Sequence, residues 1–303
     1  MARRVPGVTI IMKLHLQFFG LAIFGSLLLA AAPSAAAKSW IKSSSFKPDL
    51  VEVYKEVDDQ SLAIHIFYPG SKKPEKPSPA IVMFHGGGFS KGKPDGFFYF
   101  CEYLVSRGMV AISVQYRLGD QLNCLKDAKS AMRHVYKNAA KYGIDPEKVA
   151  AGGGSAGGHL AAALATSKLI NEETDDLSIS TMPAALVLFN PILGHGGGVN
   201  SWKPEIRDDF RPWTGIHDKM PPTLSMWGEK DKFLSPEVMK EFQKKMTDAG
   251  VRCEIEIYPD QGHSFFDDEE KWVTTTVGRA DTFLASIGFI EGEPTVKEWV
   301  SQQ

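Results

Sequence analysis

The stretch from residue 148 to residue 168 constrains the fold most strongly, because it joins a strand pattern to a helix pattern through a turn of small residues. The letters KVAAG suit a buried strand, and HLAAALATSK suit a helix. Between them lies GGGSAGGH, residues 152–159. Glycine is costly to order, so this turn indicates a backbone that bends sharply and approaches its neighbours closely. The segment therefore predicts a strand, a tight turn and a helix in direct succession.

The same alternation of short apolar runs and helical stretches continues along most of the chain. The other apolar runs that read as parallel strands are AIVMF, MVAISVQY, ALVLFN, PTLSMWG and RCEIEIYP. The predicted helices cover residues 97–106, 124–142, 156–167, 236–249 and 272–286. Strand–helix alternation predicts an α/β fold, with a mostly parallel central sheet and helices on both faces.

Two further segments differ from this alternation. Near the front, DLVEVYKEV and SLAIHIFYP alternate like two antiparallel strands joined by a turn at residues 58–60. Residues 193–220 are irregular and rich in glycine, tryptophan and proline, which favours an insert or small cap over one edge of the sheet. We expect residues 38–303 to form one domain with this insert inside it.

The first 37 residues have the pattern of a secretory signal peptide. Basic residues precede an apolar run at residues 18–32, and the small residues of PSAAAKS follow it. The pattern predicts cleavage before Lys38 and an exported, periplasmic or extracellular chain without stable membrane insertion after cleavage. An uncleaved anchor is the alternative, although the run is short for a full span. Translation from Met1 and from Met12 both fit the pattern.

Charge and cysteine content exclude several kinds of site. A net charge of −2 gives no support to nucleic acid, an anionic membrane surface or a polyanion as partner. The three cysteines, Cys101, Cys124 and Cys253, do not form a disulfide framework, and any pairing among them stays open. Cys253 lies in a strand pattern, where a cysteine is usually a small core residue. No cysteine or histidine spacing resembles a zinc site, so no metal and no cofactor is predicted.

Ser155 is the candidate nucleophile. It is the central residue of a G-x-S-x-G sequence that begins at Gly153 and ends at Gly157. Between a strand and a helix, this motif places the serine hydroxyl at the head of the helix, exposed to substrate. The turn is so tight that small residues are needed two positions before and two after the serine. The alternative is a glycine-rich turn without chemistry.

A serine hydroxyl is a weak nucleophile and needs a base, which is itself oriented by an acid. His263 follows the last strand-like run, in a loop from which an imidazole could reach back over the strand ends. The other two histidines beyond the helix at 156–167 are His195 and His217, and both lie in the irregular insert.

Asp231 is the candidate acid, because it lies in the loop after the strand-like PTLSMWG. Its rivals are Glu229 and Asp260. Glu229 lies closer to the strand end, and Asp260 is nearly adjacent in sequence to the proposed base.

The sequence HGGGF at residues 85–89 follows the strand-like AIVMF. Hydrolysis of an ester passes through a tetrahedral oxyanion, which backbone N–H groups stabilise when they can approach closely. We expect the amides of Gly87, Gly88 and Ala156 to form this oxyanion site. His85 is expected to shape the loop rather than to act as a base.

Four motifs occur in the order HGGGF, GGSAGGHLA, GEKDKFLSP and YPDQGHSFFD. In this order they resemble the α/β-hydrolase fold, and they are similar to the hormone-sensitive-lipase-like esterases and the related bacterial acetyl-xylan and feruloyl esterases. The resemblance covers nearly all of residues 38–303. It implies a catalytic triad of Ser155, Asp231 and His263, with an oxyanion hole at Gly87, Gly88 and Ala156.

The resemblance implies a secreted serine carboxylesterase that acts on a small-molecule or carbohydrate ester. Lipase-like members carry a longer helical cap at the N-terminus, whereas here strand-like residues begin soon after the predicted signal peptide. We therefore expect an open site and short acyl groups such as acetyl, or feruloyl groups, rather than long acyl chains. One alternative is a serine peptidase of the prolyl-oligopeptidase type, which normally has a large extra domain. The other is a non-catalytic ligand receptor like the plant gibberellin receptors, which lack the catalytic histidine. Cleavage of simple esters or of an aminoacyl-proline anilide separates these functions.

Overall fold

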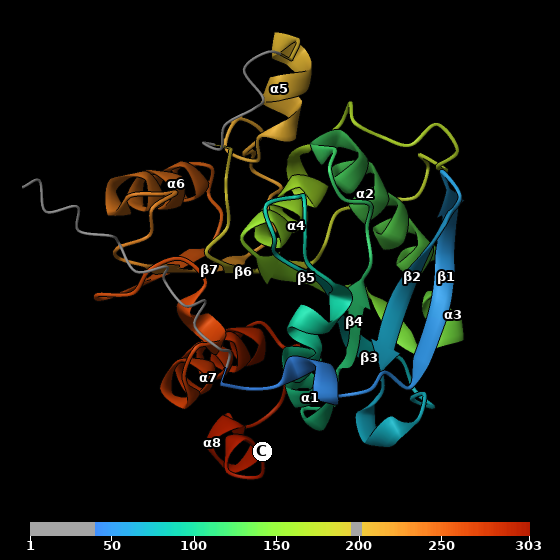
Figure 1. Ribbon diagram of the computed structural model, residues 1–303, viewed down its shortest axis with the longest axis vertical. Helices are drawn as coiled ribbons and strands as arrows, with labels where there is room; N and C mark the ends of the chain where they lie inside the picture. Colours follow the sequence, from blue (N-terminus) through green and yellow to red (C-terminus); the bar gives the residue numbers. More distant parts are fainter. Residues whose placement is uncertain (1–39, 195–201) are drawn as a thin grey trace, which may run out of the picture. The chain divides into compact units, whose positions relative to one another are not determined.

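The computed structural model describes residues 40–194 and 202–303, and within them eight strands form one sheet (Figure 1). The strands are β1 (Leu50–Val57), β2 (Gln60–Phe67), β3 (Ser78–Phe84), β4 (Val110–Val114), β5 (Ile144–Gly154), β6 (Ala185–Phe189), β7 (Thr223–Gly228) and β8 (Cys253–Tyr258). Their order across the sheet is β1-β2-β4-β3-β5-β6-β7-β8. Strand β2 pairs antiparallel with β1 and with β4, and the remaining pairs are parallel. The predicted mostly parallel sheet with an antiparallel start is confirmed.

Helices cover both faces of the sheet, as the alternation predicts. They are α1 (Phe98–Ser106), α2 (Gln121–Lys137), α3 (Ala139–Tyr142), α4 (Ala156–Thr166), α5 (Pro204–Phe210), α6 (Pro236–Asp248), α7 (Glu270–Ser286) and α8 (Val296–Val300). Figure 1 shows α2, α4 and α6 on one face and α1, α7 and α8 on the other. Each face holds its own cluster of buried hydrophobic side chains.

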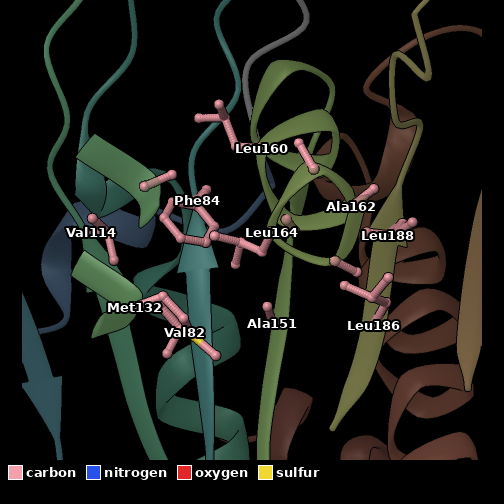
Figure 2. Close-up of a cluster of buried hydrophobic side chains, with 14 of the residues drawn as sticks. Val82, Phe84, Val114, Met132, Ala151, Leu160, Ala162, Leu164, Leu186 and Leu188 are labelled. Atoms are coloured by element: carbon pink, nitrogen blue, oxygen red, sulfur yellow. The ribbon is translucent and has the colours of Figure 1, made fainter. Parts of the chain in front are cut away.

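Strand β3 illustrates why the central strands are apolar throughout. Val82 and Phe84 belong to the cluster under α2 and α4, whereas Ile81 and Met83 belong to the cluster on the opposite face. Figure 2 shows Phe84 beside Leu164 of α4. Successive side chains of a strand point to opposite faces of the sheet. A strand covered by helices on both faces therefore has apolar side chains at successive positions, and apolar and polar residues do not alternate along it.

The hairpin of β1 and β2 turns through Asp58 and Asp59, as predicted. Val57 pairs with Gln60, so the loop has two residues. Both aspartates have positive φ angles, of 49° and 57°. This is the geometry that suits a two-residue hairpin, and aspartate tolerates it better than most residues do.

The prediction of one helix over residues 124–142 is wrong. The chain forms α2 and then the separate short helix α3, which ends at Gly143 in a left-handed conformation. Helix α2 also begins earlier than predicted, at Gln121. The carboxylate of Asp120 accepts hydrogen bonds from the amides of Leu122 and Asn123, at 2.8 and 3.0 Å, and so caps the helix.

The segment predicted as irregular contains a helix, α5, that the sequence pattern does not reveal. The carboxylate of Asp209 near its end accepts hydrogen bonds from Ser167 and from the amides of residues 168–170. Helix α5 is therefore fixed to the chain that leaves α4. Residues 195–201, which include His195, and the predicted signal peptide at 1–37 lie outside the described residues.

The three cysteines are free and buried. Cys253 belongs to the hydrophobic cluster under α6, as its strand pattern predicts. Over residues 40–194 and 202–303, no helix combines the length and the apolar character needed to cross a bilayer.

Candidate active site

Ser155 lies at the sharp turn between β5 and α4, in a strained backbone conformation. Its φ and ψ are 54° and −115°, a region that costs a non-glycine residue on the order of 1–3 kcal/mol. Glycines on either side make the turn possible. A Cβ on Gly153 would lie 2.3 Å from the carbonyl oxygen of Phe84, and a Cβ on Gly157 would lie 1.9 Å from the same oxygen. The predicted need for small residues two positions before and after the serine is confirmed.

The structure brings Ser155, His263 and Asp231 together in one hydrogen-bonded chain. Nε2 of His263 lies 2.7 Å from Oγ of Ser155, and its Nδ1 lies 2.8 Å from Oδ2 of Asp231. The three residues follow β5, β8 and β7, so they meet at the carboxyl edge of the parallel strands, where α/β sheets usually place their sites. A carboxylate only accepts hydrogen bonds, so Nδ1 of the imidazole carries the proton and Nε2 faces the hydroxyl as an acceptor.

Asp231 is held as a carboxylate. Its side chain is only 1% exposed. Burial alone would raise the pKa of Asp231, but hydrogen bonds from His263, the amide of Phe233 and the side-chain amide of Asn190 together hold its pKa below the ordinary value. A charged partner for the imidazole is therefore present whenever His263 takes up a proton.

The carboxylates of the two alternative acids, Asp260 and Glu229, have other partners. Asp260 pairs with Lys230 at 2.6 Å, and Glu229 accepts a hydrogen bond from the amide of Asp260. Among the hydrogen bonds of the described residues, none joins either carboxylate to His263. His217 is also remote, with Nε2 lying 3.1 Å from the carbonyl oxygen of Ala165.

The glycine loop after β3 passes directly beside Ser155. A Cβ on Gly86 would lie 3.5 Å from Cβ of Ser155. The following glycines serve the shape of the loop itself: Gly87 and Gly88 have φ angles of 123° and 61°, and a Cβ on Gly87 would lie 2.0 Å from the carbonyl oxygen of Lys91. Within the described chain, the amides of Gly87, Gly88 and Ala156 donate no hydrogen bond. These N–H groups are thus available to a ligand.

The contacts of His85 fit the expected role of shaping the loop. Its ring stacks on Tyr116 with centroids 4.2 Å apart, and the hydroxyl of Tyr116 donates to the carbonyl oxygen of His85 at 2.6 Å. Burial lowers the pKa of His85, which favours the neutral imidazole. Nδ1 of this ring lies 2.8 Å from the carbonyl oxygen of Gly86, inside the loop.

Two residues at this site escape sequence reasoning. Asn190 directly follows β6 and donates to Asp231, and its only sequence signal is an amide at the end of an apolar run. Phe233 lies edge-on to the ring of His263, with centroids 4.5 Å apart, and is 57% exposed. Nothing in the sequence around Phe233 distinguishes it from a loop residue.

Acidic, histidine and cysteine side chains do not gather into a metal-binding group of three or more anywhere in residues 40–194 and 202–303.

Two protein-family models match separate parts of the chain. BD-FAE matches residues 64–187, and the dienelactone hydrolase family matches residues 211–290. Among solved structures, esterase 2 of Thermogutta terrifontis is 36% identical with a TM-score of 0.75, and the match covers 80% of this chain and 96% of that one. Structures of that esterase with propionate and with butyrate bound are similar to this chain, with TM-scores of 0.74 and 0.73.

Two curated relatives match smaller shares of this chain. An acetylxylan esterase of Xylanibacter ruminicola is 26% identical over 212 residues, which are 63% of this chain and 42% of that protein. The esterase LipI of Mycobacterium tuberculosis is 31% identical over 124 residues, or 39% of each chain. The chain thus spans less than half the length of these two relatives.

Proposed function

The chain belongs to the α/β-hydrolase serine esterases, and from this membership we propose that it hydrolyses short acyl esters through a covalent intermediate on Ser155. The observation that carries the proposal is the hydrogen-bonded chain from Asp231 through His263 to Ser155, which ends beside unpaired backbone amides. A nucleophile, a base, an orienting acid and an oxyanion site are the parts that acyl transfer requires.

In the first half of the reaction, Oγ of Ser155 attacks the ester carbonyl carbon while Nε2 of His263 takes the hydroxyl proton. The carbonyl oxygen becomes an oxyanion facing the amides of Gly87, Gly88 and Ala156, where each donor is worth about 2.7–4 kcal/mol. The intermediate then collapses. The bond to the alcohol oxygen breaks, His263 returns its proton to that oxygen, and the acyl group remains on Ser155.

In the second half, water replaces the alcohol. His263 removes a proton from the water, whose oxygen attacks the acyl carbon, and a second tetrahedral oxyanion forms in the same position. When it collapses, Oγ of Ser155 leaves with the proton from His263 and the carboxylic acid departs. Asp231 stays ionised throughout and stabilises the imidazolium in both halves.

The proposed substrates are esters of short acids, with acetyl or feruloyl groups on a carbohydrate as the leading class. Support comes from the relative that is an acetylxylan esterase and from the related esterase structures that hold propionate and butyrate. We further propose that the chain is exported, on the basis of the basic, apolar and small-residue pattern of its first 37 residues. Sequencing the N-terminus of the protein secreted by a bacterial host tests export, with a start at Lys38 as the expected result.

A panel of substrates tests the proposed activity. We expect p-nitrophenyl acetate and butyrate to give higher kcat/KM than decanoate, acetylated xylan to release acetate, and an aminoacyl-proline anilide to stay intact. A steady rise in kcat/KM up to the palmitoyl ester would contradict the short-chain proposal. Faster cleavage of the anilide than of the acetate would point to a peptidase.

A further inference from the structure

Two aromatic rings close the space beside the nucleophile on its buried side. Gly154 directly precedes Ser155, and a Cβ built on it would lie 2.9 Å from Cζ of Phe266 and 3.2 Å from Cζ of Phe97. Phe97 ends the short helix η3 (Pro94–Phe97), and Phe266 is central in η5 (Phe265–Asp267), three residues after His263. The ring tips thus reach the backbone that carries the nucleophile.

These two rings pack as one unit. They stack with centroids 5.9 Å apart and planes 15° apart, and each also contacts Phe189, at 5.6 and 5.1 Å. Phe97 is 2% exposed and Phe266 is 8% exposed. Close packing of this kind leaves no room for an alkyl chain beside Gly154.

A surface groove is lined by residues that neighbour these two rings in the chain. Its volume is about 730 Å³, and it is lined in part by Trp40, Asp95, Gly96 and Asp267. Asp95 and Gly96 immediately precede Phe97, and Asp267 immediately follows Phe266 in the chain. A volume in this range is typical of pockets that hold small molecules. The two segments that carry the rings thus approach Gly154 at Phe97 and Phe266 and line the groove at Asp95, Gly96 and Asp267.

The acyl group, rather than the alcohol, is the part of the ester that meets these rings. The departing alcohol takes its proton from Nε2 of His263, so it must lie beside that imidazole. Phe233, which contacts the same imidazole, is 57% exposed, so this side of the site faces solvent. The acyl group, on the other side of the ester carbonyl carbon, is then expected to extend towards Gly154.

We propose that Phe97 and Phe266 form a partition between Ser155 and the groove lined by their neighbours in the chain, and that this partition sets the acyl-length limit of this esterase. This inference rests on the proposed function, because it explains a preference for short acyl groups. It also predicts that the preference for short acyl groups depends on these two side chains. The groove is already present in the fold, so removing a ring should be enough to admit a longer acyl chain.

The test compares acyl-length profiles of Phe97→Ala, Phe266→Ala and a control, Phe100→Ala. Phe100 is fully buried in the same cluster and contacts Phe97 and Phe189, but it is not among the atoms nearest to Gly154. Its truncation leaves a similar void without opening the partition. Phe97→Leu and Phe266→Leu serve as milder variants where an alanine variant does not fold, and thermal melting verifies folding of all of them.

We expect the ratio of kcat/KM for decanoyl esters to kcat/KM for butyryl esters to rise at least about tenfold in the Phe97 and Phe266 variants. This is the scale on which hydrophobic pockets discriminate chain length. In Phe100→Ala the ratio should stay near the wild-type value. Acetate esters of methanol to decanol should show no such gain. An unchanged acyl profile in folded variants, or a gain confined to the alcohol series, overturns the inference. A wild-type enzyme that prefers decanoyl esters instead overturns the proposed function, so the two failures are distinguishable.

Discussion

The side-chain amide of Asn190 lies 2.9 Å from Oδ2 of Asp231, the carboxylate oxygen that also faces His263. Asn190 comes from the end of β6, the strand next to the one that precedes Asp231. Its donor helps to fix the carboxylate in place and to keep it ionised. The orientation of the imidazole thus depends on a residue outside the triad.

Asn190→Ala is expected to lower kcat about tenfold with little change in KM, because a hydrogen bond to a charged group contributes roughly 1.5–3 kcal/mol. Asn190→Asp should be worse, since a second carboxylate would then face Asp231. Steady-state kinetics on p-nitrophenyl butyrate checks both. If both variants keep wild-type kcat, Asn190 has no part in positioning the acid.

Asp231→Asn is expected to lower kcat by roughly 10³–10⁴-fold, in line with loss of the orienting acid in other serine triads. Glu229→Gln and Asp260→Asn are the matched controls, and both should stay within roughly tenfold of wild type. The three variants are measured side by side on one short-chain ester. If Asp231→Asn keeps the wild-type kcat while Glu229→Gln or Asp260→Asn loses most of it, the third member of the triad is wrongly assigned.

Gly157→Ala is expected to disrupt the turn that presents Ser155. In an ordinary helix, alanine is favoured over glycine by about 1 kcal/mol, but here the new Cβ would lie 1.9 Å from the carbonyl oxygen of Phe84. A forced shift of the turn should lower kcat/KM by roughly 10²-fold. Gly278→Ala in α7 is the control, because its Cβ meets only the end of the Val296 side chain, at 3.0 Å. Equal activity of the two variants would contradict a tight turn.

His159 is expected to make the protein less stable in mild acid. Burial lowers the pKa of His159 to about 4 from an ordinary value of 6.5, despite opposing hydrogen bonds with the backbone of Ile192 and Phe210. The unfolded chain therefore binds this proton more readily than the folded one does. The stability that the neutral ring contributes is complete above about pH 6.5 and is lost as the pH falls to about 4.

The size of the loss is on the order of 3 kcal/mol, since each unit of pKa difference is worth about 1.4 kcal/mol. Urea unfolding of wild type and of His159→Leu at pH 7 and pH 4.5 measures it. Wild type should lose more free energy of unfolding between the two pH values than the leucine variant does. Equal losses would show that His159 does not contribute to the acid sensitivity.

Sequence patterns predict most of the fold because the relevant signals are local. The hairpin at Asp58 and Asp59, the strand–turn–helix around Ser155 and the apolar central strands each follow from a few neighbouring residues. They also place Ser155, Asp231 and His263 in loops at the same edge of the sheet, because parallel strands share their carboxyl ends.

What escapes prediction depends on contacts between distant segments. Helix α2 ends with its cap residue Asn138, before α3, although no proline or glycine stands there to predict a break. Helix α5 is held in place by Asp209, which accepts hydrogen bonds from a loop about forty residues earlier in the chain. Asn190 and the Phe97–Phe266 pair gain their roles from neighbours that only the folded sheet brings together. No local pattern distinguishes them from ordinary strand-end and core residues.

Covalent labelling of Ser155 tests the proposed mechanism most directly. Paraoxon transfers its diethylphosphoryl group to an activated serine oxygen, a P–O bond forms, and 4-nitrophenolate leaves. We expect one equivalent of nitrophenolate per chain, loss of esterase activity in step with its release, and a mass increase confined to the peptide that contains Ser155. Ser155→Ala should fold, release none and hydrolyse no ester. A label on another residue, or ester hydrolysis by Ser155→Ala within tenfold of wild type, would contradict the assignment of Ser155 as the nucleophile.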